Sequence, residues 1–171
     1  SSDLNTLTEV ELKRCAAEAV AIAKASAKVQ AQPMTLSPIK AVQDVYRTQV
    51  KVDPFDIPMD ERLDFLRAID KELQSEPSIK VAQSSLMALK EHKWFVSSEG
   101  SCIEQEIVET GASISATAAG NGDVQRRSFS DYAAAGFEVV ESMNLKDLAG
   151  GLAKEGVAVV SADSCSKGAT S

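Results

Sequence analysis

The chain has 171 residues, which is enough for one domain with a hydrophobic core, or for one domain with an extended arm. Its composition, 44% hydrophobic and 25% charged, is that of an ordinary soluble protein, and no apolar run approaches the roughly 20 residues that span a bilayer. The formal net charge of −7 argues against direct nucleic-acid binding, because phosphate contacts need clustered Lys and Arg.

Cysteine usage and the N-terminal sequence bear on where the protein works. Cys15, Cys102 and Cys165 are odd in number and lie far apart, which favours reduced thiols and a cytoplasmic location over a disulfide framework. The opening letters SSD show neither a secretory signal nor an initiator methionine. We therefore interpret the chain as a fragment of a longer protein.

The N-terminal third predicts a helix followed by an extended linker. Thr8 and Glu11 fit a capping box, and the alanine-rich stretch that follows predicts a helix to about Val29. Its shallow apolar face would make only a thin core by itself. Residues 30–57 are interrupted by prolines and contain one short β-like run, Tyr46–Val52, so we interpret them as a linker without a core of its own.

A second helix is predicted from Pro58 to Gln74. Proline is favoured in the first turn of a helix, where Asp60 and Glu61 also suit the positive end of the helix dipole. The helix carries an apolar stripe at helical spacing, formed by Leu63, Leu66, Ile69 and Leu73.

Beyond Pro77 the apolar residues alternate with polar ones, which is typical of strands. We predict strand patterning from Ile79 with a polar interruption at residues 83–85, and a hairpin turn at Lys90–Lys93. The following elements are strands or turns, in the order Trp94–Val96 (strand), Ser98–Ser101 (turn), Cys102–Glu109 and Gly111–Ala119 (strands), Gly120–Asp123 (turn) and Val124–Tyr132 (polar edge strand).

The C-terminal part predicts one further helix, capped by Asn144, and then a flexible tail or cut point at residues 163–171. The apolar side of this helix comprises Leu145, Leu148, Ala149, Leu152 and Val159.

These elements predict an α+β fold: an antiparallel sheet of about four to five strands with helices packed on one face, preceded by the N-terminal helix and linker. The expected domains are 1–57 (helix and wrapping linker), 58–162 (central α+β domain) and 163–171 (tail). The other face of the sheet is rich in hydroxyl groups, which indicates contact with water or a partner: Ser84, Ser97, Ser113, Ser115, Thr117, Ser128 and Ser130.

No catalytic or metal-binding constellation is recognisable. A zinc site needs several ligands brought together, and we interpret the single histidine, His92, as a solvated turn residue. The carboxylates of Glu104 and Glu106 would share one strand face as solvated charges and disfavour a thiolate at Cys102, which we assign a structural role. We therefore predict no catalytic residue, no metal ligand and no cofactor within this chain.

An ordered set of short segments nevertheless resembles the TldD/PmbA family. They are VKVDPF and IPM at residues 50–59, FVSSEGS at 95–101, AGFE at 135–138, and the helix from Leu148 that leads to Ser161, Ala162 and Cys165. Two positions depart from the family pattern, because Gly156 stands in place of alanine and Ser166 in place of proline. The resemblance covers most of the chain, and its first helix looks like the end of the family's first domain.

The resemblance implies that the chain is the central, non-catalytic region of a zinc metallopeptidase of the TldD type, which acts on peptides or unfolded proteins. Such proteins are often labelled modulators of DNA gyrase. The zinc-binding His-Glu-x-x-x-His helix of the family lies in the C-terminal half, beyond this chain, so zinc is expected only in the full-length protein. Expected partners are the remainder of the polypeptide, a homodimer or TldD/TldE-like heterodimer partner and a peptide substrate, with no nucleic acid and no membrane.

Two other interpretations remain open: the same region of the zinc-less PmbA/TldE-type partner, or a free-standing protein-binding or assembly module. The sequence offers one candidate contact site for substrate or a neighbouring subunit, the elbow formed by Ser98, Glu99, Gly100 and Ser101. Its simplest interpretation is a hairpin corner in which glycine supplies the backbone geometry. The hydroxyl-rich face and exposed strand edges are expected to help receive an extended peptide.

Overall fold

The computed structural model describes residues 6–29, 32 and 37–162. The chain divides into two compact units, Ser1–Ile39 and Lys40–Ser171. The predicted tail at residues 163–171 lies outside the described residues, as does part of the predicted linker.

In its described part, the first unit consists of one helix, α1 (Glu9–Val29). The predicted cap is formed, since the backbone N–H of Glu11 donates to Oγ1 of Thr8 over 3.3 Å. Ion pairs one turn apart follow on the surface, such as Lys13 Nζ and Glu9 Oε1 at 2.6 Å. No residue of α1 is buried among the described residues. Alanine propensity and surface ion pairs therefore stabilise this helix locally.

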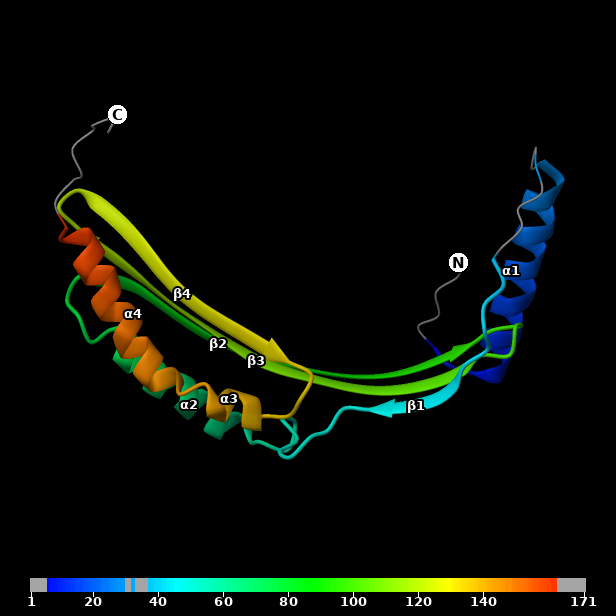
Figure 1. Ribbon diagram of the computed structural model, residues 1–171, viewed down its shortest axis with the longest axis horizontal. Helices are drawn as coiled ribbons and strands as arrows, with labels where there is room; N and C mark the ends of the chain where they lie inside the picture. The colour runs from blue at the N-terminus through cyan, green and yellow to red at the C-terminus, as the bar shows by residue number, and fades with distance from the viewer. Residues whose placement is uncertain (1–5, 30–31, 33–36, 163–171) are drawn as a thin grey trace. The chain divides into compact units, whose positions relative to one another are not determined.

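The second unit is built on a four-stranded mixed sheet (Figure 1), whose strands are β1 (Gln43–Arg47), β2 (Ile79–Val96), β3 (Cys102–Gly120) and β4 (Asp123–Ala133). β3 lies in the middle. β2 pairs antiparallel along one of its edges, while the other edge takes β1 in parallel and β4 antiparallel. The α+β prediction is confirmed, and the parallel pairing of β1 is an addition to it. The predicted β-like run was Tyr46–Val52, whereas β1 spans Gln43–Arg47, so the two overlap only at Tyr46 and Arg47.

β2 and β3 are longer than predicted because each runs through a point where the sequence suggested a break. The predicted hairpin turn at Lys90–Lys93 is wrong: these residues pair with β3 in unbroken register. Their charges are satisfied on the strand, where Lys90 binds Asp53 at 2.8 Å and Lys93 binds Glu91 at 3.0 Å. The predicted interruption at residues 83–85 is likewise absent from β2. No residue of this stretch of β2 adopts the positive φ that a tight hairpin turn demands.

The two glycine-containing turns are confirmed. Gly100 has φ of 95° at the β2–β3 turn, where Ser97 N–H donates to Ser101 O over 3.0 Å. The β3–β4 turn places Asn121 at φ 52° and Gly122 at φ 78°. Glycine and asparagine tolerate this left-handed region better than other residues, so both turns follow from their sequence.

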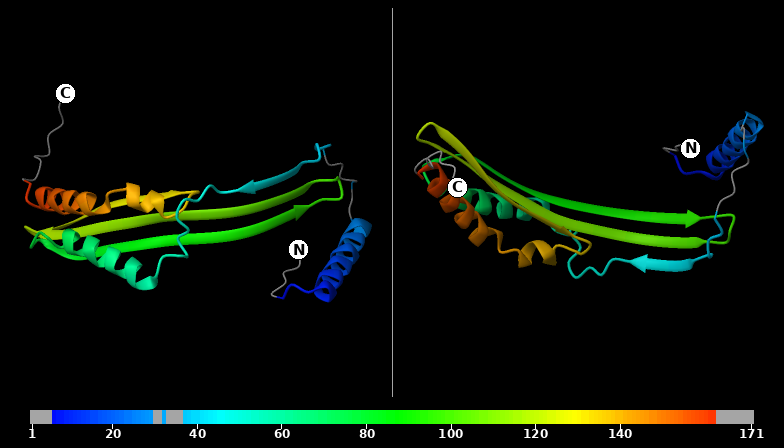
Figure 2. Two further views of the ribbon diagram at one scale, coloured as in Figure 1. Left: turned by 90° about the horizontal axis from the view of Figure 1, so that it is seen from below. Right: turned by 45° about the horizontal axis from the view of Figure 1, so that its top comes forward.

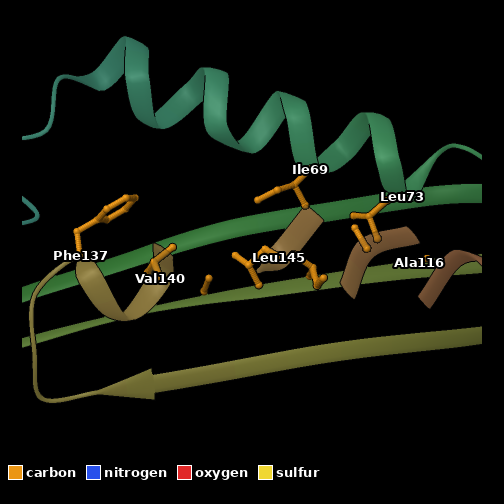
Figure 3. Packing of buried hydrophobic residues seen from close by; sticks show 9 residues of the cluster. Ile69, Leu73, Ala116, Phe137, Val140 and Leu145 are labelled. Carbon is orange, nitrogen blue, oxygen red and sulfur yellow. The ribbon is translucent and has the colours of Figure 1, made fainter. Parts of the chain in front are cut away.

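The helices α2 (Met59–Leu73), α3 (Glu138–Ser142) and α4 (Leu145–Val160) cover one face of the sheet (Figure 1). Figure 2 shows α2 along β2, and α4 on the β4 side of the same face. The core lies between these layers (Figure 3), with Ile69 and Leu73 of α2 at 0% exposure. Full burial of side chains of this size contributes about 1.5–3 kcal/mol each. No helix in the described part of the chain is long and apolar enough to cross a bilayer.

The helix predictions hold in position but differ in detail. Leu63 and Val159 were placed on apolar faces, yet both are exposed. Asn144 precedes α4 as predicted, but its side chain makes no cap hydrogen bond. It instead adopts a left-handed conformation, φ 48° and ψ 47°, which turns the chain from α3 into α4. α3 was not predicted, because its five residues are too few to show a helical period.

A carboxylate fastens the segment after β1 to the helical layer. Glu138 accepts hydrogen bonds from the backbone N–H groups of Val52 (3.0 Å), Lys51 (3.2 Å) and Gly136 (3.2 Å). Phe137 N–H donates to Val52 O over 2.8 Å. Burial alone would raise the pKa of Glu138, but the backbone donors outweigh it and hold the pKa below the ordinary value of 4.5. These hydrogen bonds, the Glu138 clamp, therefore hold Lys51 and Val52 against the start of α3 while Glu138 is ionised.

Candidate functional site

The sheet face opposite the helices is lined with hydroxyl groups, as the sequence predicted. The strand register aligns side chains into two neighbouring rows across β2, β3 and β4, which are Ser85–Ser113–Ser130 and Gln83–Ser115–Ser128. Ala112, Ile114 and Ala116, which alternate with these serines on β3, point into the core instead. Around these rows, the sheet therefore has one apolar face under the helices and one hydroxyl-lined face.

Two predicted members of this face lie elsewhere. Ser84 alternates with the row residues and falls on the helix side, and Ser85 takes its place, with its Oγ 2.8 Å from the Oγ of Ser113. The Oγ of Ser97 accepts a hydrogen bond from the N–H of Ser101 over 3.3 Å, so it belongs to the turn. The error over Ser84 is a shift of one residue, which moves a side chain to the other face of a strand.

The rows form the floor of an open groove of about 730 Å³. Arg126 is its only cation and Asp70 its only carboxylate among the lining residues. Nη2 of Arg126 donates to Oγ of Ser115 over 3.2 Å. At one end, the ring of Tyr132 lies against Gly111 so closely that a Cβ at position 111 would overlap it. Because each hydroxyl can both donate and accept, this floor suits neutral polar groups such as peptide amides.

The predicted elbow lies at the far end of the β2–β3 hairpin from the groove. About 12 residues of β2 separate Ser85 from the elbow, which corresponds to about 40 Å of extended strand. Ser98, Glu99 and Gly100 are exposed at the corner, whereas Ser101 is only 5% exposed. Oγ of Ser101 accepts the N–H of Val42 over 3.1 Å and thereby fixes the entry into β1. The structure does not bring the elbow and the groove together.

His92 lies within β2 and not in a solvated turn, which corrects its interpretation. Its Nε2 is 3.0 Å from Oε1 of Glu104, and its ring stacks on Trp94 with centroids 3.7 Å apart. Glu104 and Glu106 share a strand face as predicted, but Arg47 of β1 pairs with both, at 3.3 and 3.6 Å. These groups therefore serve mainly to join β1, β2 and β3.

The potential metal donors are scattered. No group of three or more His, Cys, Asp or Glu side chains converges in the part of the chain that the structure describes. Cys102 is a free cysteine with an exposed side chain at the start of β3. Its backbone N–H donates to Val42 O over 2.8 Å, so its position is set by pairing with β1.

Arg126 and Tyr132 are groove residues that sequence reasoning did not single out. Both alternate with Phe129 and Arg127 along β4, and only the β3–β4 register shows which of them face the serines. A usable signal was the alternation of Arg126, Ser128 and Ser130 in the predicted polar edge strand. Period two places these three side chains on one face.

Comparison with known proteins gives a family and a fold. Residues 52–160 match the family model of the PmbA/TldA metallopeptidase central domain. This range runs from the segment clamped by Glu138 to the end of α4. No curated protein matches the sequence.

Among solved structures, the chain is similar to a "putative modulator of a DNA gyrase" from Thermotoga maritima MSB8, with a TM-score of 0.58 and 13% sequence identity. The similarity covers 85% of this chain and 32% of that protein, so the chain spans about a third of the length of this relative. At this identity the likeness shows the fold alone.

Proposed function

Because the chain belongs to the PmbA/TldA metallopeptidase family, whose central domain it contains, we propose that it is a non-catalytic part of a TldD-type metallopeptidase that acts on peptides or unfolded proteins. In this role it supplies a scaffold, a surface that guides extended polypeptide and a surface on which subunits pair. The exposed thiol of Cys102 is consistent with a reducing, cytoplasmic setting for the parent protein.

The residues that the structure describes do not fit the zinc ion that the family implies. A catalytic zinc site takes three protein ligands, and in the described part of the chain strand pairing brings His92 next to the carboxylates of Glu104 and Glu106. Arg47 pairs with both carboxylates, and Nε2 of His92 is already hydrogen-bonded to Glu104. In this proposal the zinc of the parent enzyme is held by another part of the polypeptide.

The hydroxyl-lined groove is the observation that carries the guiding role. An extended polypeptide presents N–H and C=O groups along its length, and a floor of serine hydroxyls can donate to one and accept from the other. Arg126 adds a charged donor for a carbonyl or carboxylate group. The groove is open and neutral for most of its length, which suits transient contact with many sequences better than tight recognition of one.

The proposal is tested by binding of a defined unfolded protein, reduced and carboxymethylated lactalbumin, to the 171-residue chain. Ser113→Val with Ser130→Val removes two hydroxyls of one row and introduces β-branched residues, which suit strands. Each lost hydrogen bond is worth about 0.5–1.5 kcal/mol, so the double variant should bind about tenfold more weakly or worse. Ser75→Val, in the exposed turn after α2, is the matched control and should bind like the wild type.

The groove role is wrong if the double variant binds as tightly as the control while both remain folded by circular dichroism. Arg126→Ala provides a second measurement, because it removes the charged donor and leaves the serines in place. A separate Ser98→Ala, Glu99→Ala variant tests the elbow, which stays a candidate contact for substrate or a neighbouring subunit.

A further inference from the structure

We propose that the outer edge of β2, from Ala88 to Val96, pairs antiparallel with the same edge of a second copy of this chain, with His92 opposite its own copy. The inference rests on the pairing surface of the proposed function and gives that surface a location and a register. It involves residues other than those of the groove, so the two proposals can fail separately.

β2 presents a long unpaired edge. It pairs with β3 along its whole length, and no other described strand pairs with it. α2 packs on the first part of β2, whereas its last part extends beyond the helices (Figure 2). An exposed edge strand offers free N–H and C=O groups to another strand, and proteins usually shorten, cover or bend such edges. The described residues show no bulge in this part of β2.

The same stretch of edge carries exposed apolar side chains on both of its faces. Leu89 and Phe95 are 47% and 54% exposed on the groove side, and Trp94 is 62% exposed on the helix side. Val96 is 72% exposed. A partner strand would cover side chains on both faces at once, which a helix lying on one face of the sheet would not do.

Symmetry restricts how two copies can pair. Identical strands that lie side by side and antiparallel are related by a twofold axis perpendicular to the sheet, which keeps each side chain on its own face. One residue must therefore lie opposite its own copy, and this residue fixes every other pair. When the central residue is Lys90, Glu91 or Lys93, a charge faces an identical charge, which is destabilising.

Centring the pair on His92 makes the charges complementary. Glu91 then lies opposite Lys93 of the second copy, and the symmetry repeats this pair on the other side of the axis. On the same face, Leu89 meets Phe95. On the other face the methylenes of Lys90, whose Nζ stays bound to Asp53 at 2.8 Å, would cover the ring of Trp94. Among the registers centred on residues 90–93, charge and apolar contacts therefore favour the one centred on His92.

Sedimentation equilibrium of the 171-residue chain tests this register through charge reversal. Glu91→Lys and Lys93→Glu each place like charges opposite one another at two symmetric positions, so each variant should self-associate about tenfold more weakly than the wild type. An equimolar mixture of the two variants should recover association, because every Lys then faces a Glu. The controls are Glu155→Lys and Lys154→Glu in the exposed part of α4, which change net charge equally and should self-associate like the wild type.

Recovery in the mixture, with weak association of each variant alone, supports the proposal. Three results overturn it: a monomeric wild type, single variants that associate as strongly as the wild type, or a mixture that associates no better than its components. Circular dichroism of each variant shows whether the fold is retained. A combined Glu91→Lys, Lys93→Glu chain, which restores complementarity within one polypeptide, should associate like the wild type and repeats the test independently of mixing.

Discussion

Replacing Gly156, a buried glycine within α4, with alanine should stabilise the protein. Gly156 lies in α4 against the sheet. A Cβ built there would lie 3.5 Å from Cβ of Ala118 and 3.7 Å from Cδ1 of Ile79. Both distances are ordinary van der Waals contacts, so the methyl group fits without displacing a neighbour.

Two effects add in the same direction. Alanine is favoured over glycine in a helix interior by about 0.8–1.0 kcal/mol, because glycine loses more backbone entropy on folding. Burial of the added carbon contributes up to about 0.8 kcal/mol. The expected gain is therefore about 1–2 kcal/mol, which corresponds to a rise in Tm of about 2–8 °C for a chain of this size.

Equilibrium unfolding in urea, followed by circular dichroism, measures this gain. Gly151→Ala is the matched control, because Gly151 is in the same helix but a Cβ there would meet nothing within 4 Å. The control should gain only the helix-propensity part, about 1 kcal/mol. The denaturant slope m should stay unchanged in both variants, since neither alters the surface exposed on unfolding.

A destabilised Gly156→Ala protein would refute the packing of α4 on β2 and β3 as described. A gain no larger than that of Gly151→Ala would show that the added methyl group is not buried, and would refute the packing argument alone.

Three further predictions concern the segments that join β1 to the rest of the sheet unit. Gly136→Ala should destabilise by about 1–3 kcal/mol in urea unfolding, because the new Cβ would overlap the backbone O of Val52; a neutral result would contradict the close approach. Glu138→Gln should lower the free energy of unfolding at neutral pH. Because the pKa of Glu138 is lowered in the folded protein, this loss should stay constant above the ordinary pKa of 4.5 and shrink as the pH falls through the lower, folded pKa. A loss that grows in acid would exclude the hydrogen bonds of Glu138. Ser101→Ala removes the acceptor for the N–H of Val42, so hydrogen exchange at Val42 should accelerate, and unchanged protection there would argue against this bond.

The helices could be predicted from the sequence because their signals are local. The cap at Thr8, the first-turn acids of α2 and the spacing of Ile69 and Leu73 lie within a few residues of one another, and the structure shows each of them. The glycine-containing turns were predictable for the same reason, since Gly100 and Gly122 need positive φ whatever surrounds them.

The sheet could be predicted only in outline, because its pairing is decided by distant residues. β1 pairs with β3, and the paired residues Gln43 and Cys102 are 59 positions apart in the sequence. No local pattern in the sequence indicates such a parallel partner. The charged residues Lys90 and Lys93 suggested a turn because their partners, Asp53 and Glu91, were not foreseen. The role of Glu138 could not be predicted, because three of its hydrogen-bond donors are backbone N–H groups, which every residue except proline carries.

The sequence predicted only part of the candidate site. Alternating hydroxyl residues indicated a polar sheet face, and most of them do share one face. The exchange of Ser84 for Ser85 shows that composition finds such a face, whereas register decides its members. The separation of the groove from the elbow could not be inferred while Lys90–Lys93 was interpreted as a turn.

Hydrogen exchange of the chain with and without reduced, carboxymethylated lactalbumin tests the central claim most directly, because it locates the contact without any substitution. If the groove receives extended polypeptide, added protection should appear in residues 83–85, 113–115 and 126–130, the parts of β2, β3 and β4 that form its floor. Protection confined to the helices α2 and α4, or no change on addition of the unfolded protein, would contradict the claim.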